Sequence, residues 1–139
     1  MITAVTCLAM AIYFEARDQP IAGQLAVAQV VLNRVLDKRH PDTVCKVIME
    51  GPVHASGHPV RNMCQFSFWC DGKPERPRDK EAWRTAVMIA TAVTGPDTYI
   101  IDVSEGATFY HSTKVSPAWK YTMHATVEIG QHVFYKTER

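Results

Sequence analysis

The stretch TCLAMAIYFEA, from Thr6 to Ala16, determines the architecture that we expect for this chain. Nearly every residue in it is apolar, which is typical of a helix buried on most of its faces rather than of an amphipathic surface helix. Glu15 is the exception, and it stands near the end of the run. The sequence therefore predicts a core helix that ends beside a poorly solvated carboxylate.

Apolar residues at helical spacing predict three more helices. The second begins at Pro20, a residue suited to a first helical position, and runs to about Leu36 with the stripe Ile21, Leu25, Ala28, Leu32 and Val35. A short third helix starts near Asp42 or Thr43, either of which can cap it, and its inward-facing residues are Val44, Val47 and Ile48. A fourth follows an N-cap at Asp79, stops at Gly95-Pro96 and has the core stripe Trp83, Ala86, Val87 and Ala90.

The remaining segments predict a loop and a sheet. Residues 51–78 hold four prolines and three glycines, which indicates a long irregular loop. After Gly95 the apolar period changes to two, and strands are predicted at Tyr99–Val103, Ala107–His111 and His132–Lys136. Gly130-Gln131 fits a two-residue hairpin turn, and Ser116-Pro117 starts a short helix between the last two strands. The whole is one α+β domain over residues 1–139, mainly helical, with a small antiparallel sheet toward the C-terminus.

The composition excludes several classes of protein. A chain of 139 residues with 47% hydrophobic and 21% charged residues suits one globular domain, and we expect a monomer. A net charge of +1 with no run of like charges argues against nucleic-acid binding. The uncharged run from Met1 to Phe14 is shorter than the roughly 18 residues of a membrane-spanning helix, and it lacks the flanks of a signal peptide. We therefore expect no stable membrane insertion.

The four cysteines are compatible with a disulfide framework or with four buried free thiols. They are Cys7, Cys45, Cys64 and Cys70, and no Cys-x-x-Cys pair is present, which disfavours a zinc ribbon or a thioredoxin-like redox site. A bridge between Cys64 and Cys70 would pin a short loop. Cys7 and Cys45 would then form the second pair.

The position of Glu15 favours one kind of chemistry. Apolar surroundings disfavour the charged form of a carboxyl group and raise its pKa, so that it can hold a proton near neutral pH. Cleavage of a glycosidic bond needs such a general acid, because the leaving oxygen departs poorly until it is protonated. In the alternative reading, Glu15 ends the first helix at the surface or pairs with Arg17 or Arg34.

A set of motifs decides between these readings. The stretch from Ala11 to Arg17, followed by Pro20, Gly23-Gln24, Ala26-Val27-Ala28 and Val31-Leu32-Asn33-Arg34-Val35, closely resembles the SleB/CwlJ-like cell-wall hydrolases, typified by spore-cortex lytic enzymes. Further matches are Gln65-Phe66-Ser67, Ala107 with His111, Pro117-x-Trp119 and Ile129-Gly130-x-His132-x-Phe134-Tyr135. The resemblance spans essentially the whole chain. It implies a lysozyme-like catalytic domain in which Glu15 is the catalytic acid.

The resemblance also implies the reaction. Peptidoglycan would be cleaved between N-acetylmuramic acid and N-acetylglucosamine, by a lytic transglycosylase that leaves 1,6-anhydro-muramic acid. A hydrolase would instead need a second carboxylate, from Asp18, Asp71 or another Asp. Many family members have Gly-Glu where this chain has Asp18-Gln19, so that carboxylate is lost and its role is unassigned here. Such an enzyme acts on the cell wall, in the periplasm or outside the cell, as a phage lysin released from the host cytoplasm or as a secreted enzyme whose leader has been removed.

Four residues in the matching segments are candidates for substrate binding: Gln65, Ser67, Tyr110 and His111. Their amide, hydroxyl and imidazole groups suit sugar hydroxyls and N-acetyl groups. The alternative for Tyr110 and His111 is packing within a strand, and for Ser67 it is stabilisation of the loop. Trp69, Trp83 and Trp119 offer faces for sugar stacking, although a Trp in so small a chain is more often core.

Two other functions compete with this one. A metal site could use His54 and His58 with His111, His124 or His132, but no His-Glu-x-x-His is present and Gly57 and Pro59 disfavour the helix that such a pair needs. We expect no metal and no cofactor. A disulfide-stapled module could grip peptidoglycan without cutting it, and it would have no use for a buried acid.

Overall fold

The computed structural model describes residues 2–96 and 99–138, and the apolar run near the N-terminus forms α1 (Ala4–Ala16). Thr3 caps this helix, because its side chain accepts a hydrogen bond from the Thr6 backbone N–H at 3.2 Å. Every residue from Cys7 to Tyr13 is buried. The prediction of a core helix is confirmed, and Glu15 lies in its last turn.

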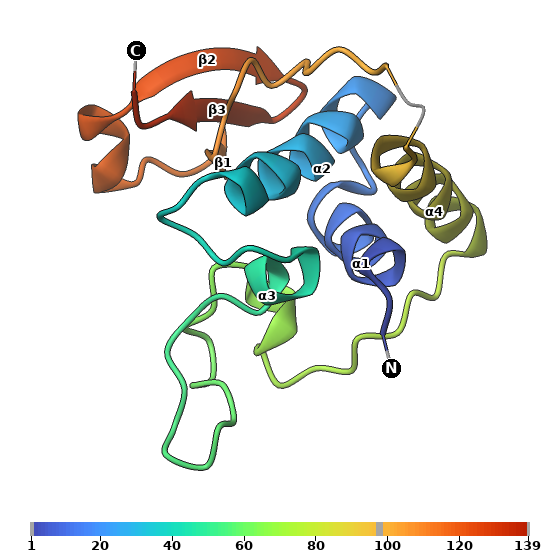
Figure 1. The fold of residues 1–139 in the computed structure, drawn as a ribbon, viewed down its shortest axis with the longest axis vertical. Coiled ribbons are helices and arrows are strands. Elements are labelled where there is room, and N and C mark those ends of the chain that lie inside the picture. The colour runs from blue at the N-terminus through green and yellow to red at the C-terminus, as the bar shows by residue number, and fades with distance from the viewer. Residues whose placement is uncertain (1, 97–98, 139) are drawn as a thin grey trace.

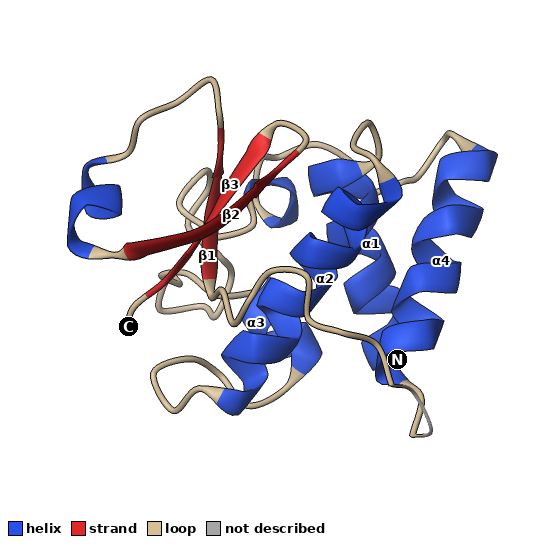
Figure 2. Cartoon of the chain, turned by 90° about the horizontal axis from the view of Figure 1, so that it is seen from above, coloured by secondary structure: helices blue, strands red, loops and turns tan. Residues whose placement is uncertain are grey.

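The second helix, α2 (Ile21–Leu36), lies at the centre of the molecule. Figures 1 and 2 show it between the sheet on one side and α1 with α4 (Lys80–Thr94) on the other. Val31 packs in the core shared with α1, whereas Val27 packs in a second core beneath the sheet. The predicted helix is confirmed. Ile21 was expected to belong to its buried stripe, but it is 59% exposed. The helix buries two faces, one against α1 and one beneath the sheet, instead of the single face expected.

The other two helices begin as predicted, and α4 (Lys80–Thr94) also ends as predicted. Thr43 caps α3 (Val44–Ile48) by accepting from the Lys46 N–H at 3.3 Å, and Asp79 caps α4 by accepting from the Ala82 N–H at 3.1 Å. The last helical residue of α4 is Thr94, directly before Gly95. Both helices pack against α1, so that α1 is enclosed on most of its sides.

An antiparallel sheet covers the opposite side of α2. It contains β1 (Phe109–Ser112), β2 (His124–Ile129) and β3 (His132–Lys136) in the order β1-β3-β2. The predicted turn joins β2 to β3, and Gly130 adopts a φ of +57°, which glycine tolerates best. Tyr110 of β1 lies opposite Phe134 of β3. The expected α+β fold with a small C-terminal sheet is confirmed, and β1 is one of its edges.

In this region one predicted strand is wrong, one is displaced and one observed strand was not predicted. Tyr99–Val103 is irregular, because Gln29 replaces a neighbouring strand: its side-chain amide donates to the Ile101 carbonyl and accepts from the Val103 N–H, both at 2.9 Å. The strand expected at Ala107–His111 begins two residues later, after a turn organised by Asp102. β2 was missed, since a register shift between Ala125 and Val127 breaks its alternation. The short helix, a 3-10 helix named η2 (Ala118–Thr122), therefore lies between β1 and β2.

Residues 51–78 form the expected irregular loop, interrupted by a 3-10 helix, η1 (Ser67–Trp69), and an isolated bridge between Val53 and Pro59. A disulfide between Cys64 and Cys70 closes part of this loop, and one between Cys7 and Cys45 ties α1 to α3. All four cysteines are thus paired, and the reading of free thiols is wrong.

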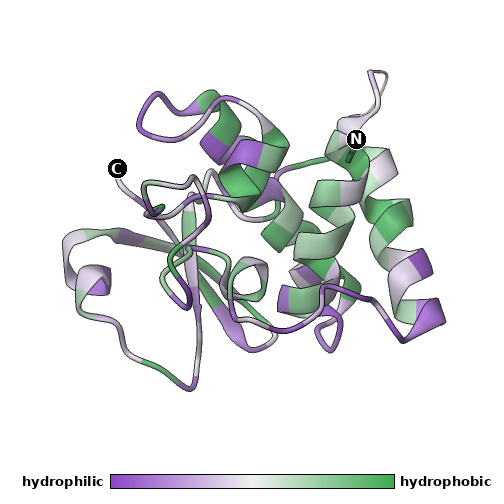
Figure 3. Ribbon diagram, turned by 90° about the horizontal axis from the view of Figure 1, so that it is seen from below, coloured by the Kyte–Doolittle hydropathy of each residue, from purple (hydrophilic) through white to green (hydrophobic). Residues whose placement is uncertain are grey.

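Hydrophobic residues gather on the helices, whereas many of the connecting loops are hydrophilic (Figure 3).

Within the described part of the chain, no helix has both the length and the apolar character needed to cross a membrane.

Candidate active site

A cleft of about 400 Å³ opens where the end of α1 meets β1 and the loop before η1. Its walls contain all five residues predicted for the site: Glu15, Gln65, Ser67, Tyr110 and His111. These residues come from three segments that are far apart in the sequence. The fold thus brings the predicted residues together in one concave space.

Glu15 is the carboxyl group of this cleft. Burial raises its pKa from the ordinary value of 4.5 to about 7, and a hydrogen bond with Tyr110 opposes part of that rise. Among the described residues that line the cleft, no other carries a carboxyl group; Asp18 and Asp71 lie outside it. A group that is half protonated at neutral pH can both give and take a proton there.

Tyr110 connects the sheet to Glu15. Its side chain packs against the cluster that contains Val27 of α2, and its ring centroid lies 5.7 Å from that of Phe134. Burial, together with the nearby Glu15, holds the pKa of the Tyr110 hydroxyl well above its usual value, so it remains a donor. It donates to the Glu15 carboxylate. The sequence indicated Tyr110 as a substrate contact, but it did not indicate this bond.

His111 lines the cleft with both ring nitrogens engaged. Nδ1 donates to the Ser112 carbonyl at 2.7 Å, because a carbonyl oxygen can only accept. Nε2 then accepts from the Tyr135 hydroxyl at 2.9 Å. In this arrangement the imidazole forms part of the wall and has no nitrogen left for a sugar.

Gln65 and Ser67 form the opposite wall. Both side chains are exposed, and within the described residues neither has a protein hydrogen-bond partner. Their backbone is held in place, since the Gln65 N–H donates to the Glu50 carbonyl at 2.9 Å and the Cys64–Cys70 disulfide flanks both residues. Two polar groups on a fixed segment therefore face the cleft.

Trp119 is the tryptophan that lines the cleft. Its ring lies 5.4 Å from Phe109 and 5.6 Å from His111, so it extends the wall formed by β1. Trp69 lines a separate apolar hollow beside the Cys7–Cys45 disulfide, and Trp83 packs against Tyr13 in the helical core. Sequence alone could not separate the three, because the distinction depends on how η2 folds back over β1.

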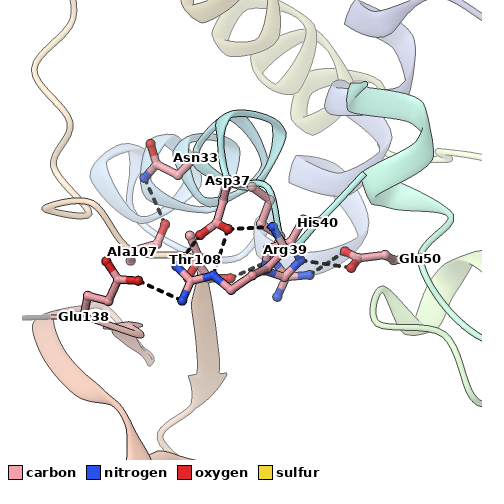
Figure 4. A network of polar contacts seen from close by, with 9 residues as sticks. Asn33, Asp37, Arg39, His40, Glu50, Ala107, Thr108 and Glu138 are labelled. Atoms are coloured by element: carbon pink, nitrogen blue, oxygen red, sulfur yellow. Dashed lines mark hydrogen bonds and ion pairs between the residues drawn. The ribbon is translucent and has the colours of Figure 1, made fainter. Parts of the chain in front are cut away.

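Arg34 also lines the cleft, and its role was not predicted. Its Nη1 forms an ion pair with Glu50 at 3.0 Å, and its Nε donates to the Thr108 carbonyl at 2.6 Å. Figure 4 shows two of these partners, Glu50 and Thr108, together with His40, whose Nδ1 donates to the second oxygen of Glu50 at 2.9 Å. The partner of Arg34 is therefore Glu50, and among the described residues Glu15 forms no ion pair with Arg34 or Arg17.

The metal alternative relied on His54 and His58. These residues lie on the exposed loop, where the His58 ring contacts the Ser56 hydroxyl at 3.2 Å. Across residues 2–96 and 99–138, no group of three His, Cys, Asp or Glu side chains is arranged to hold a metal ion.

Comparisons with known proteins identify the family of this chain. The sequence profile of the cell wall hydrolase family matches residues 18–135. This chain belongs to the cell wall hydrolase family. Glu15 lies three residues before the matched range, so the family match does not itself include the carboxyl group of the cleft.

Relatives of this cell wall hydrolase include the spore cortex-lytic enzymes of Halalkalibacterium halodurans, 34% identical over 94% of the chain, and of Bacillus subtilis, 33% identical over 94%. The chain spans 34% and 36% of the length of these two proteins. Among solved structures, the catalytic domain of the germination-specific lytic transglycosylase SleB from Bacillus anthracis is similar, with a TM-score of 0.68 and 30% identity. That match covers 96% of this chain and 93% of the SleB domain.

Proposed function

We propose that this cell wall hydrolase cleaves the β-1,4 bond between N-acetylmuramic acid and N-acetylglucosamine as a lytic transglycosylase, with Glu15 as acid and then base. The observation that carries the proposal is a single carboxyl group in the described lining of the cleft, with a pKa raised to about 7. The similarity to the SleB domain, itself named a lytic transglycosylase, supports it.

The reaction follows from these groups. Protonated Glu15 gives its proton to the glycosidic oxygen, the bond from that oxygen to C1 of muramic acid breaks, and N-acetylglucosamine leaves with a free 4-hydroxyl. The Glu15 carboxylate, stabilised by the Tyr110 hydroxyl, then takes the proton of the muramic C6 hydroxyl while that oxygen bonds to C1. The products are a 1,6-anhydro sugar and a protonated Glu15, and no water is consumed.

A hydrolytic reaction is the weaker alternative. It needs a second carboxylate roughly 5 to 9.5 Å from the first, as a nucleophile or as a base that activates water. Asp18 and Asp71, the candidates from the sequence, lie outside the cleft lining, and Glu50 is held by Arg34 and His40. The lytic route uses the substrate's own hydroxyl and needs no such partner.

Substrate and location follow from the same proposal. The glycan strand passes along the cleft, with Gln65 and Ser67 on one wall and β1 on the other, and the protein works as a monomer on the cell wall outside the cytoplasmic membrane. None of this requires a cofactor.

The Glu15→Gln variant separates an enzyme from a binding module. Gln has nearly the same shape but no proton to donate at neutral pH, so release of soluble fragments from purified peptidoglycan should fall at least a thousandfold while co-sedimentation with peptidoglycan and circular dichroism persist. A variant that releases fragments at the wild-type rate would refute the role of Glu15. If neither protein releases fragments but both bind, the chain is a wall-binding module.

A further inference from the structure

Arg34 is fixed from two sides at the back of the cleft. Its Nε donates to the Thr108 carbonyl and its Nη1 to Glu50, and the guanidinium lies 4.7 Å from the centroid of the Phe109 ring. The residue is only 4% exposed. Because His40 holds the other oxygen of Glu50 at 2.9 Å, the carboxylate cannot turn away without breaking a second bond.

Among the described residues, Nη2 of the Arg34 guanidinium has no hydrogen-bond partner. A guanidinium has five N–H donors, and the bonds to Thr108 and Glu50 use Nε and Nη1. In the described part of the chain, the side-chain polar atoms that are both sealed from solvent and unpartnered are Thr108 Oγ1 and His132 Nδ1. Nη2 of Arg34 is therefore not sealed from solvent, and Arg34 is one of the residues that line the cleft.

We propose that Nη2 of Arg34 binds an amide carbonyl oxygen of peptidoglycan in this cleft. The inference rests on the proposed function, since it places the glycan beside Glu15. Glu50 already balances the positive charge of Arg34. The Nη2 group therefore offers a hydrogen-bond donor, but the ion pair as a whole has no net charge to attract an anion. A carboxylate bound there would put a second anion against one cation in a poorly solvated place, which is costly, whereas a carbonyl oxygen needs only a donor.

The rigidity of Arg34 favours binding. A free arginine side chain loses rotamer freedom when it grips a ligand, but this one is already ordered by Thr108, Glu50 and two aromatic rings. Peptidoglycan carries amide carbonyls in its N-acetyl groups and in its stem peptides. Both groups present a carbonyl oxygen as the acceptor, and probes that carry only one of the two groups distinguish them.

The test measures binding in the Glu15→Gln background, where turnover is blocked, and uses two probes. One is a glycan oligomer that keeps its N-acetyl groups but lacks stem peptides; the other keeps its peptides but is de-N-acetylated. By calorimetry, Arg34→Lys should weaken binding of the probe that carries the relevant carbonyl about tenfold or more, since lysine keeps the charge but loses the fork of donors. If the substitution weakens binding of the first probe alone, the bound carbonyl belongs to an N-acetyl group. If it weakens binding of the second probe alone, the bound carbonyl belongs to the stem peptide.

Arg39→Lys is the matched control, because it makes the same change at an arginine that pairs with Asp37 and Glu138 outside the cleft lining. We expect its affinity for the same probe to stay within about threefold of the parent, which a general effect of losing a guanidinium would not allow. If Arg34→Lys does not fold, the Nε–H signal of Arg34 is followed instead in the ¹⁵N NMR spectrum of the parent, and we expect it to shift when the probe binds. Equal affinity of a folded Arg34→Lys variant, or an unmoved Nε–H signal with both probes, would overturn the inference and leave the role of Glu15 untouched.

Discussion

The Tyr110 hydroxyl donates a hydrogen bond to the Glu15 carboxylate, across the junction between the sheet and the first helix. Burial and this bond act on the Glu15 pKa in opposite directions, and burial is the larger effect. The balance leaves a carboxyl group with a pKa of about 7, which is half protonated at neutral pH.

Glu15→Gln should stabilise the fold at high pH. The folded-state pKa of Glu15, about 7, exceeds its ordinary value of 4.5, so the fold favours the protonated form. The wild type therefore has its full stability below about pH 4.5 and loses it as the pH rises through about 7. Chemical denaturation should show the variant to be more stable by up to about 3 kcal/mol at pH 8, with no difference at pH 4. An equal difference at both pH values would contradict the raised pKa.

Tyr110→Phe should move the pH profile. Its hydroxyl favours ionised Glu15, so its loss raises the Glu15 pKa further and shifts the alkaline limb of activity to higher pH, with a rate lowered roughly tenfold. Tyr135→Phe is the control, because it removes the hydroxyl that His111 accepts from and leaves the Glu15 contact intact. The same shift in both variants would mean that the hydrogen bond to Glu15 is not its cause.

The two disulfides should differ in what their loss costs. Replacing Cys7 and Cys45 by Ala opens a separation of 38 residues, and replacing Cys64 and Cys70 opens one of 6. From loop entropy we expect losses in the free energy of unfolding of about 4 and about 2 kcal/mol, respectively. The second variant should also raise KM, since Gln65 and Ser67 lie inside the bridged segment. Unchanged KM in a folded Cys64→Ala/Cys70→Ala variant would argue against a substrate-binding role for that wall.

Trp119→Ala should weaken substrate binding, because its ring forms part of the cleft wall with Phe109 and His111. We expect KM to rise roughly five- to tenfold with a smaller change in kcat. Tyr121→Ala is the matched control, since Tyr121 belongs to the same 3-10 helix but is 80% exposed and lies outside the cleft lining. A larger effect from Tyr121 would place the glycan elsewhere.

The helices and the position of Glu15 could be predicted because their signals are local. The apolar run of α1, the caps Thr43 and Asp79, and the stop at Gly95 each depend on neighbouring residues. The sheet was harder, since its pairing depends on distant partners. No local signal reveals that Gln29 satisfies the backbone of Ile101 and Val103, and this contact is what keeps that segment out of the sheet.

The same distinction holds within the site. Motif matching named Gln65, Ser67, Tyr110 and His111, and the structure places all of them in one cleft. Their individual contacts could not be read from the sequence, because the register of β1 against β3 sets which side of the strand each residue faces. That register turns Tyr110 toward Glu15 and His111 toward Tyr135. Arg34 was missed as a cleft residue, since a buried arginine on a helix gives no sign of which loop it will meet.

The most direct test of the proposed lytic reaction is mass spectrometry of the fragments released from purified peptidoglycan in water enriched in ¹⁸O. We predict fragments that end in 1,6-anhydro-muramic acid and carry no ¹⁸O, and none from Glu15→Gln, because the oxygen that closes the ring comes from the sugar itself. Reducing-end fragments that carry one ¹⁸O would contradict the account and require a hydrolytic partner for Glu15.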